Sequence, residues 1–112
     1  ILNNHYMGMV RQWQELQHGN RLSESYMDSL PDFVKLAESF GAVGLRAKKP
    51  SDLDDMIKEM IKVERPVIFD VWVDKKENCF PMIPSGSTHD QMLLGPDDEV
   101  DGAVTEDGMV LV

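Results

Sequence analysis

The sequence contains a single cysteine, Cys79, so it cannot form an internal disulfide. A lone cysteine fits a reducing compartment, and we expect a cytoplasmic protein. No apolar run approaches the roughly 20 residues of a membrane-spanning helix, so no membrane association is expected. The chain shows no signal peptide and does not begin with methionine. We therefore expect a fragment, a processed chain or a partial reading frame.

Basic residues are absent from the C-terminal part of the chain. No lysine or arginine follows Lys76, and the segment after it carries eight acidic residues. Residues 1–76, in contrast, carry 12 acidic and 11 basic residues. Because nucleic-acid binding requires a basic surface, no nucleic-acid partner is expected. We interpret residues 95–112 as an acidic, solvated tail that follows a folded part comprising residues 1–94.

Several common functional motifs are also missing. The sequence has neither G-x-G-x-x-G nor a P-loop, which disfavours nucleotide binding by those routes. His89-Asp90 has no nucleophile elbow to accompany it, and the three histidines are too far apart for a recognisable ligand spacing. A serine-hydrolase centre and a histidine metal site are therefore not expected.

Three segments have the pattern of helices. Residues 8–17 place Met9, Trp13 and Leu16 on one helical face. A second helix is predicted to begin at Pro31 and to end before a glycine. The third helix has Ser51 as its predicted N-cap, followed by a variant of the capping box. Its apolar residues recur at helical spacing: Leu53, Met56, Ile57, Met60 and Ile61.

Strands alternate with these helices. Residues 42–47 read as a short strand, and residues 67–73 read as an apolar strand covered on both faces. Asp70 is the odd charge in that apolar run, and it either pairs with a neighbour or faces an edge. A further strand ends at Asn4. The alternation predicts an α/β fold with a small, mostly parallel sheet flanked by helices, thin enough to be part of a larger sheet.

Asn3-Asn4 stands at the predicted end of the first strand, which is where open α/β sheets bind ligands. Amide oxygens are suitable ligands for a hard cation such as Mg²⁺. The helix that begins at Gly8 offers unpaired N–H groups to a phosphate. This arrangement predicts a metal–phosphate site, although two asparagines after a strand more often form a simple turn.

Longer motifs carry a resemblance to a known family. Residues 1–14 read Ile-Leu-Asn-Asn-His-Tyr-Met-Gly-Met-Val-Arg-Gln-Trp-Gln, and residues 79–86 read Cys-Phe-Pro-Met-Ile-Pro-Ser-Gly. With residues 31–38 and 66–70, they resemble the catalytic large subunit of acetohydroxyacid synthase, also called acetolactate synthase. The resemblance covers residues 1–94. It implies that the chain is a C-terminal fragment of the three-layer thiamine-diphosphate-binding fold.

The resemblance also implies a reaction. Enzymes of this family use thiamine diphosphate, Mg²⁺ and FAD, and the cofactor supplies the difficult carbanion chemistry. They condense pyruvate with pyruvate or 2-oxobutyrate in branched-chain amino-acid biosynthesis. The implied partners are the remainder of the catalytic subunit, a regulatory small subunit and further copies in a homo-oligomer.

Individual site residues follow from the same match. Asn4 resembles the side-chain ligand of Mg²⁺, and Tyr6 resembles the residue that binds it through a backbone carbonyl. Gly8 and Met9 resemble the turn that faces the cofactor. Trp13 resembles the tryptophan of the substrate channel. No catalytic residue is implied within this chain.

The match also has gaps that leave alternatives open. The family's Gly-Asp-Gly segment, its catalytic glutamate and most of its FAD site have no counterpart here, so we expect the isolated chain to be inactive. His5 stands where glutamine or glutamate is common. One alternative is a stand-alone α/β interaction module without catalysis. Another is a different thiamine-diphosphate enzyme such as a pyruvate oxidase or glyoxylate carboligase, against which Trp13 and residues 80–86 count.

Overall fold

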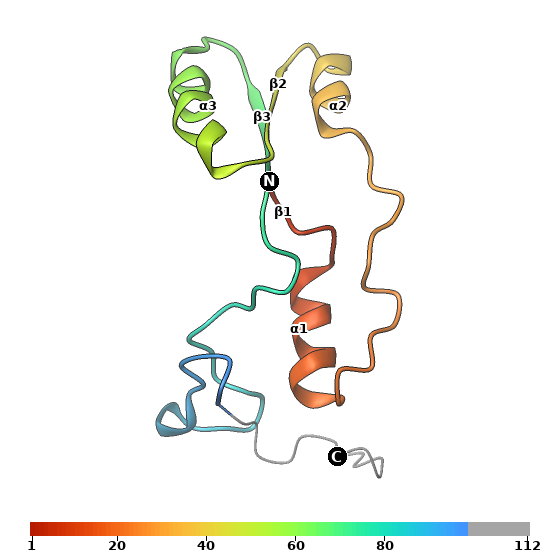
Figure 1. Cartoon of the computed structure of the whole chain (residues 1–112), viewed down its shortest axis with the longest axis vertical. Helices are drawn as coiled ribbons and strands as arrows, with labels where there is room; N and C mark the ends of the chain where they lie inside the picture. Colours follow the sequence, from red (N-terminus) through yellow and green to blue (C-terminus); the bar gives the residue numbers. More distant parts are fainter. Residues whose placement is uncertain (99–112) are drawn as a thin grey trace. The chain divides into compact units, whose positions relative to one another are not determined.

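The computed structural model of the chain describes residues 1–98 and divides into two compact units (Figure 1). The first unit comprises residues 1–5 and 28–75. The described part of the second comprises residues 6–27 and 76–98. Most of the predicted tail, from residue 99 onward, lies outside the described residues, and the boundary after residue 94 stays a prediction.

The first unit is built on a three-stranded sheet. Its strands are β1 (Leu2–Asn3), β2 (Val43–Ala47) and β3 (Val67–Trp72), in the order β1-β3-β2. Both pairings are parallel, which confirms the predicted α/β class. The two longer strands lie within one residue of their predicted limits at each end.

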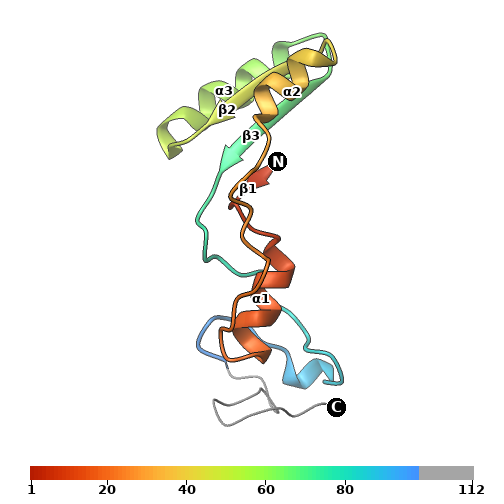
Figure 2. The ribbon, with the colours of Figure 1, turned by 90° about the vertical axis from the view of Figure 1, so that its right-hand side faces the viewer.

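Helices α2 (Phe33–Ser39) and α3 (Pro50–Lys62) lie on opposite faces of this sheet (Figures 1 and 2). Both contact β2 and β3, so the unit has three layers, as the resemblance implies. Side chains alternate between the faces along a strand. Gly44 marks the face under α2, because a Cβ built on it lies 2.6 Å from Val34 Cα. Gly44 pairs with Ile68 in the register.

Both helix starts in this unit differ from the prediction. Pro31 precedes α2, which begins only at Phe33, because the Asp32 carboxylate accepts hydrogen bonds from two backbone N–H groups and forms the N-cap. Ser51 is not the N-cap of α3 and no capping box forms there. The helix begins at Pro50, two residues before the start that a Ser51 N-cap would give, and a missing N–H costs nothing at that first position.

Few apolar side chains are fully buried in the described residues. They are Ala37, Ala47, Pro84 and Leu93. Phe40 is 82% exposed and Ile61 74%, so the apolar stripes of α2 and α3 are only partly covered. No helix within residues 1–98 has the length and apolarity that a membrane crossing requires.

The second unit contains α1 (Gly8–Gln17) and the short 3-10 helix η1 (His89–Gln91). The limits of α1 confirm the predicted helix. The apolar face identified in its sequence is not its buried face, however: Met9 is 47% exposed, whereas Arg11 and Gln12 are buried. Polar contacts therefore hold α1 in its unit.

The close approach of β2 to α2 gives a stability prediction. Gly44→Ala would bring a methyl group into the backbone of Val34, and we expect it to destabilise the first unit by about 1–3 kcal/mol. Urea unfolding followed by Trp72 fluorescence, in a Trp13→Phe background, measures this change. Gly95→Ala is the control, since a Cβ there meets no atom within 4 Å. Equal stability of the two variants would contradict the packing described.

Candidate functional site

The two neighbouring asparagines at the end of β1 have different environments. Asn3 is buried; its Nδ2 donates to Asp70 Oδ1 at 2.9 Å, and its Oδ1 accepts from the His5 N–H at 3.1 Å. This second bond closes a side-chain turn, within which His5 has a φ of 61°. Asn3 thus holds the shape of the turn, and Asn4 is the half-buried residue inside it.

Asp70 is the centre of a hydrogen-bond network in the first unit. Its side chain is 1% exposed and accepts from Asn3, from Arg46 Nε at 2.8 Å and from Trp72 Nε1 at 3.2 Å. Burial raises the pKa of this carboxyl, but the three hydrogen bonds and the Arg46 charge outweigh burial and lower the pKa below its ordinary value. The predicted odd charge therefore pairs with its neighbours inside the sheet.

Arg46 extends the network to helix α2. Its second guanidinium nitrogen donates to Asp32 Oδ1 at 2.7 Å, and this bond lowers the pKa of Asp32. Asp32 is also the N-cap of α2. A continuous set of charge-assisted bonds therefore joins β1, β3, β2 and α2.

A small pocket of about 190 Å³ lies at this network. Its lining consists of Asn3, His5, Leu30, Pro31, Asp32, Arg46, Asp70 and Trp72. Cofactor sites usually exceed about 300 Å³, and the polar groups in the pocket bond to one another. We therefore do not interpret this pocket as a cofactor cleft. Its lining residues form the hydrogen-bond network that holds the end of β1 in place.

The remaining predicted site residues lie in the second unit. Tyr6 forms an isolated backbone bridge with Tyr26, and their rings meet edge to face at 5.0 Å. Gly8 is the first residue of α1, Met9 follows it, and Trp13 is half-buried on the same helix. The roles of Asn4, Tyr6, Gly8, Met9 and Trp13 stay predictions.

The N-terminus of α1 is chemically suited to a phosphate. No side chain caps it, and its first turn contains no acidic residue. First-turn N–H groups without a helical or side-chain partner attract anions, so the residues present fit the diphosphate of thiamine diphosphate. Residues 1–98 hold no group of three His, Cys, Asp or Glu suited to a metal. The predicted ligands are an asparagine amide oxygen and a main-chain carbonyl, and neither comes from a His, Cys, Asp or Glu side chain.

Two buried residues of α1 were not identified from the sequence. Arg11 donates to the backbone carbonyls of Lys76 at 3.0 Å and Glu77 at 3.1 Å, and it also bonds the side chains of Glu15 and Asn78. Gln12 bonds the backbone of Cys79. Two adjacent polar residues on a helix are normally expected to face solvent, so the local sequence does not indicate that these side chains are buried or which residues they contact.

Comparison with known proteins gives the family. Residues 1–71 match the model described as "Thiamine pyrophosphate enzyme, C-terminal TPP binding domain". The chain belongs to this family. Thiamine pyrophosphate is the same compound as thiamine diphosphate, so the match confirms the predicted cofactor class.

Named relatives agree with the resemblance. The acetolactate synthase large subunit of Haemophilus influenzae is 42% identical over 99 residues, which cover 88% of this chain. The isozyme 3 large subunit of Escherichia coli is 45% identical over 96 residues (83% of this chain). The mitochondrial catalytic subunit of Saccharomyces cerevisiae is 44% identical over 106 residues (95%). The matched segments span only 15–17% of these relatives.

The Asp70 network gives a pH prediction. Because the pKa of Asp70 is lowered in the folded state, its stabilisation is present above the unfolded pKa of about 3.9 and is lost as pH falls through the lower folded value. Asp70→Asn should reduce stability at pH 7 by about 3 kcal/mol, since it leaves Arg46 without its buried partner. The free energy of unfolding of this variant should also fall less steeply than that of the wild type as the pH drops below about 4.

The measurement is urea unfolding from pH 7 to pH 2.5, followed by Trp72 fluorescence as above. Asp55→Asn is the matched control, because that side chain is 81% exposed and lies 3.7 Å from Lys58. Exposed pairs of this kind contribute about 0–1 kcal/mol. An Asp70→Asn variant that behaves like the control would rule out the network as a source of stability.

Proposed function

We propose that the chain forms the C-terminal part of the thiamine-diphosphate-binding domain in an acetolactate synthase catalytic subunit. The complete enzyme would condense pyruvate with pyruvate or 2-oxobutyrate. One observation carries the proposal. The acetolactate synthase matches extend over 94 to 106 residues, beyond the general family model that ends at residue 71, and so include the motif at residues 79–86.

The proposal gives this chain the task of binding and orienting the cofactor. The Asn4 amide oxygen and the Tyr6 carbonyl would hold Mg²⁺ against the diphosphate, while the first turn of α1 would receive phosphate oxygens at Gly8 and Met9. Thiamine diphosphate, once bound, supplies the carbanion chemistry. Trp13 would form part of the wall of the substrate channel. FAD would bind mainly to parts of the subunit that this chain does not match.

The complete enzyme would act as a homo-oligomer with a regulatory small subunit in the cytoplasm. The partners rest on the resemblance alone, and the compartment rests on the single cysteine of the sequence. The hydrogen bond from Asn3 to Asp70 supports the metal site, because Asn3 fixes the turn that contains Asn4. Metal ligands bind well only when neighbouring groups hold them in place.

Two other functions have weaker support. A stand-alone interaction module would not account for a cofactor-domain match over residues 1–71. Another thiamine-diphosphate enzyme, such as a pyruvate oxidase, would account for that match but not for a series of acetolactate synthase relatives at 39–45% identity.

A chimera tests the metal site. The chain replaces the matching segment of the E. coli isozyme 3 large subunit, and acetolactate formation is measured with thiamine diphosphate, Mg²⁺ and FAD. Asn4→Ala should raise the Mg²⁺ concentration needed for half-maximal activity. The loss of an outer-shell partner already lowers metal affinity or activity by about 10- to 100-fold, and we expect the loss of a direct ligand to cost at least as much. Gln17→Ala, a change of a half-buried amide on α1, is the control.

Wild-type Mg²⁺ dependence in the Asn4→Ala chimera would refute the assignment of that ligand. A chimera that forms no acetolactate even with Asn4 intact would refute the proposed function.

The isolated 112-residue chain should form no acetolactate under the same conditions. One amide and one carbonyl are too few protein ligands for Mg²⁺, which gives up its water reluctantly. Turnover by the purified chain, after a buffer-matched blank, would overturn this expectation.

A further inference from the structure

Arg11 and Gln12 are the buried residues of α1, and the proposed function gives neither a role. Gln12 is 1% exposed and Arg11 3%. A polar side chain that is buried without hydrogen bonds destabilises the fold, so the partners of these residues show what their burial achieves.

Gln12 makes a two-bond pair with the backbone of one residue. Its Oε1 accepts from the Cys79 N–H at 2.8 Å, and its Nε2 donates to the Cys79 carbonyl at 3.0 Å. The same Nε2 contacts the sulfur of Met82. A side-chain amide thus takes the place of a neighbouring strand, and it fixes both the distance and the orientation of Cys79 relative to α1.

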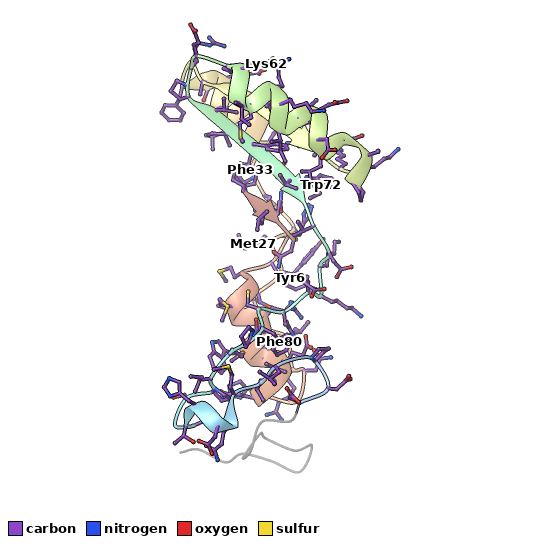
Figure 3. All side chains as sticks on the ribbon, turned by 90° about the vertical axis from the view of Figure 1, so that its left-hand side faces the viewer. Tyr6, Met27, Phe33, Lys62, Trp72 and Phe80 are labelled. Atoms are coloured by element: carbon purple, nitrogen blue, oxygen red, sulfur yellow. The ribbon has the colours of Figure 1, made fainter. Side chains whose placement is uncertain are left out.

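Cys79 leads into a loop that is closed on itself. Met82 and Leu93 exchange two backbone hydrogen bonds, at 3.0 and 2.8 Å. Residues 82–93, called the closed loop below, are closed by this bridge, and Pro84 and Leu93 are their buried residues. Figure 3 shows the segment that enters it, with Phe80 labelled, beside α1.

Arg11 holds the chain just before this point. Its guanidinium donates to two successive backbone carbonyls, those of Lys76 and Glu77. The planar, multiply donating guanidinium group keeps such a geometry better than a flexible ammonium does. Residues 76–79 are therefore attached to α1 by two adjacent side chains.

We propose that Gln12 is a positioning residue that fixes the segment entering the closed loop to the turn of α1 that carries Trp13. Trp13 follows Gln12 on α1, about 100° further around the helix, so the two hydrogen bonds to Cys79 hold that segment against the same helical turn. This inference rests on the proposed function, in which Trp13 lines the channel of the second 2-oxo acid. Pyruvate and 2-oxobutyrate differ by one methylene, and a well-fitted pocket distinguishes such a difference by about 10- to 200-fold.

The chimera described above tests this inference when pyruvate and 2-oxobutyrate compete. The measured quantity is the ratio of 2-aceto-2-hydroxybutyrate to 2-acetolactate, which does not depend on the amount of folded enzyme. Gln12→Met retains the length of the side chain and removes both hydrogen bonds to Cys79. We expect it to lower the ratio by roughly 10-fold, whereas Gln17→Met on the same helix should leave the ratio unchanged.

Gln12→Glu is the second variant. It keeps an acceptor for the Cys79 N–H but places a carboxylate oxygen against the Cys79 carbonyl, so it should also lower the ratio. An unchanged ratio in an active variant overturns the inference. Failure of both variants to fold, while Gln17→Met folds, shows a purely structural residue and overturns it equally. An inactive chimera with Gln12 intact overturns the proposed function, and the inference falls with it.

Discussion

The carboxylate of Asp70 is the group on which the first unit depends. β1 contributes only two register pairs to the sheet, Leu2 with Val71 and Asn3 with Trp72. So short an edge strand has little stability of its own. The hydrogen bond from Asn3 to Asp70 adds a charge-assisted contact at its carboxyl end. The position of the following turn, which contains Asn4, is therefore determined by a side chain 67 residues away in the sequence.

The second unit uses polar groups for a similar purpose. Its helix α1 buries a guanidinium and an amide, and both bond to backbone atoms of residues 76–79. Apolar packing tolerates small slips between surfaces, whereas paired hydrogen bonds specify one arrangement. A helix whose first turn is proposed to meet a diphosphate benefits from such precision, because binding groups act well only when their geometry is fixed.

The sequence predicted the elements and their order, because helical and strand periodicities are local. It predicted the start of α1 at Gly8 and the α/β class. The predicted helix starts in the first unit were wrong, because Asp32 caps α2 after Pro31 and α3 begins at Pro50 without a side-chain cap. Asp32 caps α2 and also accepts a hydrogen bond from Arg46. No local sequence rule predicts this second partner. The partners of Asp70 and Gln12 were unpredictable for the same reason.

The pair Asn3-Asn4 shows how two identical residues acquire separate tasks. In a parallel sheet, Asn3 faces the same side as its register partner Trp72, and therefore the same side as Asp70. Its amide is consumed by Asp70 and by the His5 N–H. Asn4, one position later, lies in the turn beyond the end of β1. The amide of Asn3 thus defines the turn in which the proposed metal ligand stands, and the two asparagines have separate tasks.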